Sequence, residues 1–376
     1  MSIRRKPERT RAVLVSLDIG RARDGDRAAE AARLIDSAGA DVVEVINGRR
    51  DRPDARTYAG SGKVEEVHVA VREHNADLVV FDQDLSAAQV RNLERELSNG
   101  GPEVRVVDRT DVIIEIFSQR ARTSEGKLQV ELARLERQST RLVRGWTHLE
   151  RQRGSLGKTG GPGEKQIELD RRMIGEQVKK LKEKIAKVGK VRATQRARRM
   201  RSGILRVSIV GYTNAGKSTL FNRLSQAKSH AADQLFATLD TTTRRVHVGE
   251  GALIALSDTV GFIRDLPHTL VDAFRATLEE TVQADLLLHV VDAASPERDA
   301  QVEAVNTVLK EIDADEVSQI LVLNQIDRVP GMVPEVVRDT SGKILNIKVS
   351  AVTGAGIELL RQALQSTQLE SDPIYE

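Results

Sequence analysis

The chain has no cysteine among its 376 residues, which excludes disulfide bonds and thiolate metal sites and is typical of a reducing compartment. Aromatic residues make up only 3%, so the cores that its 40% of hydrophobic residues can form must be aliphatic. No apolar run reaches the ~18–20 residues of a membrane-spanning helix, and Ala12–Val15 is too short for a signal peptide. We expect a cytoplasmic protein with no integral membrane segment, able at most to lie peripherally on a membrane.

Basic residues are concentrated in one stretch of the chain. The net charge is only +3, but the stretch from Arg141 to Arg201 holds 19 Lys/Arg against 6 Asp/Glu, and the remainder sums to −10. Such segregation usually marks a face that binds a polyanion.

Residues 11–118 alternate short apolar runs with helical patterns, which is typical of a parallel α/β layer. The expected strands are Ala12–Ile19, Val42–Ile46, Leu78–Phe81 and Val104–Val107. The expected helices are Arg27–Ser37, Val64–Glu73 and Ala87–Leu97.

The following segment lacks any strand pattern but has apolar residues at helical spacing in two places. They are Leu128, Leu132, Leu135 and Leu142, and then Ile174, Val178, Leu181, Ile185 and Val188. A stretch rich in Gly and Arg, from Arg144 to Gly163, separates them. We expect two long helices that fold back as an antiparallel hairpin, with a Gly-rich loop at its tip.

From about residue 203 the alternation of strands and helices resumes. Its expected strands are Leu205–Val210, Ala252–Leu256, Leu286–Val291, Ile320–Leu323 and Ile344–Val349. The expected fold class is therefore α/β, with four segments. They are an N-terminal α/β subdomain (1–120), a basic helical hairpin (121–202), a Ras-like P-loop domain (203–367) and a short acidic tail (368–376).

The third region carries a phosphate-binding motif, G-x-x-x-x-G-K-S, over residues 211–218. It follows a buried-strand pattern and opens a helix, so its glycines let backbone amides face a phosphate at a helix N-terminus. Lys217 should reach the β- and γ-phosphates, and Ser218 should bind Mg²⁺ through its hydroxyl. A chance Gly-Lys-Ser turn would lack this strand-loop-helix context.

Two later motifs select guanine. Asn324-Gln325-Ile326-Asp327 follows a strand, and Asp327 would accept hydrogen bonds from guanine N1 and N2, which adenine cannot offer. Ser350-Ala351-Val352 would supply a second contact through the Ala351 N–H. Each motif alone could be an ordinary turn, but their order and spacing predict a GTP site.

Asp258-Thr259-Val260-Gly261 ends another strand, where Asp258 should hold Mg²⁺ through water and the Gly261 amide should bind the γ-phosphate. A threonine from the segment 236–243 must complete the metal shell, and of the four candidates we choose Thr238. The residue after Gly261 is Phe262, where many GTPases place a water-orienting glutamine. Catalytic help must then come from elsewhere, and Asn214 could assist by binding K⁺, or it could merely cap the loop.

The candidate site residues fall into four groups. The catalytic candidates are Lys217, Thr238 and Gly261, and the metal ligands are Ser218 and Thr238. The nucleotide contacts are Gly211, Tyr212, Thr213, Asn214, Ala215, Gly216, Lys217, Ser218, Thr219, Phe236, Ala237, Thr238, Leu239, Asp240, Asp258, Thr259, Val260, Gly261, Asn324, Gln325, Ile326, Asp327, Ser350, Ala351 and Val352. The RNA-binding candidates, near the hairpin tip, are Arg151, Arg153, Lys158, Lys165, Arg171 and Arg172, beside Trp146 and His148, which could stack on bases.

Along nearly its whole length the chain resembles the HflX family of ribosome-associated GTPases. The specific matches are YAGSGKVEE (58–66), DQDLS (82–86), VDRT (107–110), GPGE (161–164), QIELDRR (166–172) and the segment 258–268. Departures are Thr241 in place of the usual proline, Gln325 in place of the usual lysine, and an altered basic pattern at 157–160.

The resemblance implies a GTP hydrolase that binds the large ribosomal subunit and its RNA, and splits stalled or idle ribosomes under stress. It also implies a monomer, and ATP binding through the N-terminal region. The segment Gly60-Ser61-Gly62-Lys63 could cradle that phosphate, but it lacks the full motif spacing, and we favour a turn before a helix. The alternatives are a ribosome-assembly GTPase, an ATP-dependent RNA-remodelling protein regulated by GTP, and a small-molecule kinase, which Asp327 argues against.

Overall fold

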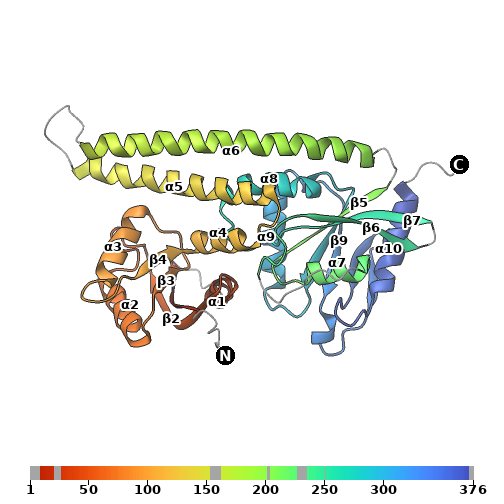
Figure 1. Ribbon diagram of the computed structural model, residues 1–376. Helices are drawn as coiled ribbons and strands as arrows, with labels where there is room; N and C mark the ends of the chain where they lie inside the picture. The colour runs from red at the N-terminus through yellow and green to blue at the C-terminus, as the bar shows by residue number, and fades with distance from the viewer. Residues whose placement is uncertain are drawn as a thin grey trace, which may run out of the picture. The chain divides into compact units, whose positions relative to one another are not determined.

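The computed structural model describes residues 9–20, 27–152, 162–200, 204–226, 235–249 and 251–371. The chain forms two compact units, the first of residues 1–119 and 131–182 and the second of residues 120–130 and 183–376 (Figure 1). No helix among the described residues is both long and apolar enough to cross a membrane.

The first unit contains a four-stranded parallel sheet in the order β2-β1-β3-β4. Its strands are β1 (Thr10–Ile19), β2 (Ala40–Arg50), β3 (Leu78–Phe81) and β4 (Arg105–Asp108). The helices α1 (Arg27–Ser37), α2 (Ser61–His74), α3 (Ala87–Leu97) and α4 (Arg109–Arg120) connect or follow them. The expected parallel α/β architecture is confirmed, with β2 extending to Arg50 beyond the predicted end at Ile46.

Local sequence explains where these helices begin. Ser86 caps α3 by accepting from the Gln89 N–H at 3.3 Å, and the Gln89 side chain accepts from the Ser86 N–H at 2.9 Å. Helix α2 starts at Ser61 directly after the turn at Gly60, whose φ of 79° suits glycine. The favoured interpretation of this segment as a turn before a helix matches that geometry.

Helices α5 (Ser124–Gln152) and α6 (Pro162–Met200) form the two long helical segments. Within the first unit, Lys182 on α6 pairs with Glu136 on α5 at 2.8 Å, as an antiparallel hairpin requires. The predicted interhelical stretch beginning at Arg144 was too long, because α5 continues to Gln152. That stretch contains four good helix formers from Leu149 to Gln152, and its glycines cluster only from Gly154 onward.

The second unit contains a seven-stranded sheet in the order β10-β11-β9-β8-β5-β7-β6. Its strands are β5 (Leu205–Gly211), β6 (Thr242–Gly249), β7 (Ala252–Asp258), β8 (Leu286–Asp292), β9 (Gln319–Asn324), β10 (Glu335–Arg338) and β11 (Ile344–Lys348). The five central strands run parallel, while β6 and β10 pair antiparallel at the edges.

Buried hydrophobic side chains from helices pack against this sheet. Helices α7 (Lys217–Ser225) and α10 (Ile357–Ser371) contribute Leu220, Phe221, Leu360 and Leu364 to the main core. Helices α8 (His268–Val282) and α9 (Arg298–Glu311) follow the turns after β7 and β8, and the short helix η1 (Ile326–Arg328) follows β9. The loops after β5, β7 and β9 therefore meet at the carboxyl edge of the parallel strands, where α/β folds bind ligands.

Candidate functional site

The loop from Gly211 to Ser218 lies between β5 and α7, as the sequence predicts. The backbone explains why Gly211 and Gly216 are glycine. Gly211 has φ 148°, and an added Cβ would lie 2.2 Å from the Val290 carbonyl oxygen. Gly216 has φ 89°, and a Cβ there would lie 2.2 Å from Asn324 Nδ2. Side chains at either position would push the loop away from neighbouring strands.

Lys217 occupies the first position of α7 and is almost fully buried in the loop that precedes it. Its ammonium group donates to the Tyr212 carbonyl oxygen at 2.6 Å. Burial lowers the pKa of Lys217 to about 8, although the nearby Asp258 opposes that shift. A buried cation with one backbone acceptor is suited to an anionic ligand such as a phosphate.

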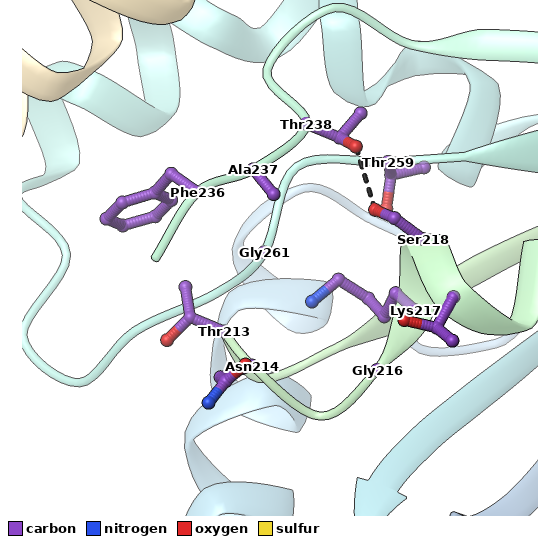
Figure 2. A pocket seen from close by; sticks show the side chains of 11 residues that line it. Thr213, Asn214, Gly216, Lys217, Ser218, Phe236, Ala237, Thr238, Thr259 and Gly261 are labelled. Atoms are coloured by element: carbon purple, nitrogen blue, oxygen red, sulfur yellow. Dashed lines mark hydrogen bonds between the residues drawn. The ribbon is translucent and has the colours of Figure 1, made fainter. Parts of the chain in front are cut away.

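Oxygens from three separate segments meet near this lysine, and Figure 2 shows two of them, on Ser218 and Thr238. Ser218 Oγ and Thr238 Oγ1 lie 2.8 Å apart, and each donates to Asp258 Oδ2 at 2.8 Å. Oxygens that bind adjacent positions of one Mg²⁺ ion at 2.0–2.1 Å are about 2.9 Å apart. The two hydroxyls therefore already have the separation that this metal requires.

The second oxygen of Asp258 strengthens that fit. Asp258 is 3% exposed, and within the described part of the chain its Oδ1 has no hydrogen-bond partner. Burial raises the pKa of Asp258, while the hydroxyls of Thr238 and Ser218 act in the opposite direction. Buried polar atoms without partners are rare, and a metal-bound water would satisfy this one.

The segment after β7 is bonded directly to the phosphate-binding loop. Phe262 N–H donates to the Gly211 carbonyl oxygen at 3.1 Å, and Thr213 N–H donates to the Phe262 carbonyl oxygen at 2.7 Å. The Phe262 side chain is fully buried, and the Tyr212 hydroxyl accepts from the Arg264 N–H at 2.8 Å. These contacts bring Gly261 against the loop, so that a Cβ on it would lie 2.9 Å from Lys217 Nζ.

The predicted guanine-binding motif, residues 324–327, is also hydrogen-bonded to the phosphate-binding loop. Asn324 donates from Nδ2 to the Ala215 carbonyl oxygen and accepts at Oδ1 from the Ala351 N–H, both at 2.9 Å. Gln325 Nε2 donates to the Asn214 carbonyl oxygen at 3.1 Å. Asp327 is exposed on η1, at the same edge of the sheet.

The candidate nucleotide contacts separate into two sets. The pocket beside the loop is lined by Thr213, Asn214, Gly216, Lys217, Ser218, Thr219, Phe236, Ala237, Thr238, Thr259 and Gly261. Outside this lining, Leu239, Ile326 and Ser350 are buried, and Val352 is 71% exposed. Thr259 belongs to the lining, and its Oγ1 donates to the Ile209 carbonyl oxygen at 2.6 Å.

Most of the RNA-binding candidates cannot be placed. Arg171 and Arg172 are exposed on α6, and Arg172 pairs only at the surface, with Glu176 at 3.3 Å. Arg153 and Lys158 lie outside the described residues, as do the side chains of Arg151 and Lys165.

One contact of this site has no counterpart in the sequence analysis. The Asp240 carboxylate turns to the backbone of Arg122 and Thr123, which are 118 and 117 residues away in sequence. No local pattern signals such a contact, because nothing in either segment indicates that the other lies beside it.

Comparison with known proteins matches three family models in succession. Residues 25–118 match the GTP-binding GTPase N-terminal model, residues 120–199 its Middle Region model, and residues 206–325 the 50S ribosome-binding GTPase model.

Curated relatives match over most of their length. GTPase HflX of Escherichia coli (strain K12) is 51% identical over 353 residues, which are 94% of this chain and 82% of that protein. GTPase HflX of Caldanaerobacter subterraneus subsp. tengcongensis is 42% identical over 358 residues, covering 95% and 80%. Among solved structures, that of SsGBP in complex with GDP covers 96% of this chain and 99% of its own, with a TM-score of 0.52 and 23% identity, a likeness of fold.

Proposed function

The chain belongs to the HflX family of GTPases and hydrolyses GTP, and from this premise we propose that it binds the large ribosomal subunit and uses GTP to split stalled or idle ribosomes. The observation that supports this most is the match to all three family segments in order, the last described as a 50S ribosome-binding GTPase. We retain the four-segment division at residues 120, 202 and 367 as part of the proposal.

The GTP site would work as follows. Lys217 would hold the β- and γ-phosphates, and Ser218, Thr238 and Asp258 would hold Mg²⁺ between them. When bound, the metal would neutralise charge that develops on the phosphates. Asn324 braces the loop through Ala215, while Asp327 reads the guanine edge.

Phe262 makes this site dependent on a partner. Its side chain is buried in the protein and its backbone is bonded to Gly211 and Thr213 at both ends, so it offers no group to orient water. Intrinsic turnover should therefore be slow, and a partner that supplies or orders catalytic groups can add ~10³-fold or more. We propose that the large ribosomal subunit is this partner.

A monovalent cation is a second source of catalytic help. Asn214 has φ 62° at the rim of the loop, and its carbonyl oxygen accepts from Gln325. Its side chain lines the pocket, where an amide oxygen can contribute to binding K⁺ near the phosphates.

The basic middle segment supplies the RNA contact in this proposal. Arg171 and Arg172 are exposed on α6, within the stretch of 19 Lys/Arg and 6 Asp/Glu. Contacts of this kind neutralise phosphates and release counterions, so binding should weaken as salt rises.

The decisive experiment is multiple-turnover GTP hydrolysis with and without purified large subunits, in K⁺ and in Na⁺ buffers. We expect large subunits to raise the rate at least ~10³-fold, and K⁺ to raise it further than Na⁺. A rate unchanged by large subunits would refute the ribosome proposal, and equal rates in the two salts would remove the role of K⁺. A variant with Lys217→Ala should show neither GTP turnover nor splitting, which excludes a contaminating GTPase.

A further inference from the structure

The segment that carries Thr238 also reaches out of the nucleotide pocket. Asp240 follows Thr238 closely, and its Oδ2 accepts from the backbone N–H groups of Arg122 at 2.8 Å and Thr123 at 3.0 Å. Its Oδ1 accepts from the Thr123 hydroxyl. All these residues belong to the second unit.

The partner of Asp240 is the start of helix α5. Thr123 immediately precedes α5, and its Oγ1 accepts from the Gly126 N–H at 3.0 Å, as an N-cap residue does. The Asp240 carboxylate thus fixes the hydroxyl that caps the helix and also adds negative charge at the helix N-terminus, where it is favourable.

Gly126 shows how closely the two segments fit. An added Cβ at Gly126 would lie 2.4 Å from Asp240 Oδ1 and 3.3 Å from Asp240 Cγ. A side chain there would displace the carboxylate, although alanine would otherwise suit a helix better than glycine.

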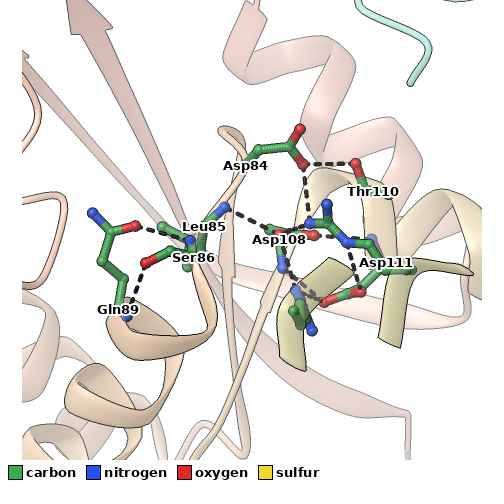
Figure 3. Close-up of polar contacts among 9 residues, drawn as sticks. Asp84, Leu85, Ser86, Gln89, Asp108, Thr110 and Asp111 are labelled. Atoms are coloured by element: carbon green, nitrogen blue, oxygen red, sulfur yellow. Dashed lines mark hydrogen bonds and ion pairs between the residues drawn. The ribbon is translucent and has the colours of Figure 1, made fainter. Parts of the chain in front are cut away.

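Farther along the same helix, Arg137 and Arg141 both pair with Asp108 in the first unit. Asp84 and Asp111 lie near Asp108 (Figure 3). Arg141 lies 2.9 Å from Asp108 Oδ2, and Asp108 is fully buried. Burial, followed by the charge of Asp111, raises the pKa of Asp108 to about 6, against the effect of the two arginines. Helix α5 therefore has a specific anchor at its first turn and another near its middle.

We propose that Asp240 is a positioning residue that couples Thr238, and hence the triphosphate state, to the first turn of α5. Binding of Mg²⁺ and GTP orders Thr238, which places Asp240 on the helix cap. By linkage, a partner that stabilises α5 favours the GTP-bound arrangement by the same factor. The coupling rests on the proposed binding of Mg²⁺ by Thr238, but it can be tested without ribosomes.

Three substitutions should break this link in different ways. Asp240→Ala removes the acceptor, Thr123→Val removes the hydroxyl at constant shape, and Gly126→Ala displaces the carboxylate. The probes are GDP and the non-hydrolysable analogue guanosine 5′-(β,γ-imido)triphosphate, titrated with Mg²⁺ present. Because an N-cap contact has about a fivefold effect on a helix equilibrium, each variant should bind the analogue about fivefold more weakly and GDP with unchanged affinity.

The link also has a direct structural readout. Hydrogen exchange of residues 124–130 should be slower in the wild type with the analogue and Mg²⁺ than with GDP. The difference should vanish in each variant, and in the wild type when Mg²⁺ is omitted. The double variant Asp240→Ala/Thr123→Val should be no weaker than either single variant, because the two groups form one contact.

Asp339→Ala is the matched control, since Asp339 also accepts backbone N–H groups in the second unit, from Ser341 at 2.8 Å and Lys343 at 2.9 Å. This variant should bind GDP and the analogue with the same affinities as the wild type. Equal losses for GDP and the analogue would assign Asp240 a purely structural role and overturn the coupling, as would unchanged affinities or additive losses in the double variant. Failure of large subunits to stimulate turnover would not alter these outcomes.

Discussion

Replacing Gly261 with alanine should disable GTP hydrolysis without harming GDP binding. The added Cβ would lie 2.9 Å from Lys217 Nζ, 2.9 Å from Thr213 Cγ2 and 3.1 Å from Thr213 Cα, where ordinary contacts begin at 3.4 Å. Lys217 is held by the Tyr212 carbonyl oxygen, and the Thr213 backbone is held by Phe262. The segment must therefore shift by a few tenths of an ångström, which moves the Gly261 amide from its expected place at the γ-phosphate.

Overpacking of this kind costs about 1–3 kcal/mol. If that cost falls on the GTP-bound arrangement, kcat/KM for GTP should fall roughly five- to 150-fold. GDP lacks the γ-phosphate, so its affinity should stay within about twofold of wild type. Single-turnover hydrolysis of γ-labelled GTP and a fluorescence titration with GDP measure the two quantities.

The control for this variant is Gly175→Ala on α6, where an added Cβ meets nothing within 4 Å. It should leave both GTP hydrolysis and GDP affinity unchanged. A Gly261→Ala protein with wild-type hydrolysis would show that the segment relaxes freely, and the argument from close packing would be wrong.

Two further predictions concern buried residues of the second unit. His289 is 2% exposed, and burial lowers its pKa to about 4, although its hydrogen bond to the Gln319 side chain opposes this shift. The unfolded chain takes up this proton near pH 6.5 and the native protein only near pH 4, so stability is lost as pH falls through that window, by about 3 kcal/mol. The pH dependence of chemical unfolding should therefore be shallower for His289→Gln, and equal slopes would contradict the assignment. Phe262→Gln should not raise basal GTP turnover, because this side chain is fully buried. It should lower the unfolding free energy by about 3 kcal/mol or more. Faster basal turnover would show that the side chain at this position can reach the nucleotide.

The elements with strong local signals could be predicted from the sequence. The apolar run before Gly211 and the helical pattern after Lys217 place β5 and α7 correctly, because both depend on near neighbours in the chain. The edge strand β10 was missed, since its four residues are half-exposed and it pairs on one side only. The observed end of α5 lies beyond the predicted one, because the helix includes Gly145 and continues through the good helix formers from Leu149 to Gln152.

In the site too, residues within local motifs could be predicted, and contacts between distant segments could not. Spacing alone does not single out Thr238 among the four threonines, and the structure brings its hydroxyl to Ser218 and Asp258. Thr243, by contrast, lies in β6 and contacts Ser257. The bond between Asp240 and Thr123 could not be predicted, because it joins segments 117 residues apart and neither has a motif of its own.

Under the proposed function, Phe262 and Asp240 together account for a phosphate site that needs a partner for full GTP hydrolysis. The Phe262 side chain has no group that could orient water. Its backbone bonds the segment after β7 to the phosphate-binding loop. Asp240 hydrogen-bonds the segment that carries Thr238 to the start of α5. The Phe262 segment is therefore bonded within the phosphate-binding site, and the Asp240 segment is bonded to structure outside it. Under the proposed coupling, the order of the Asp240 segment would depend on the contacts that α5 makes as well as on GTP, and a factor activated by binding to its target requires this property.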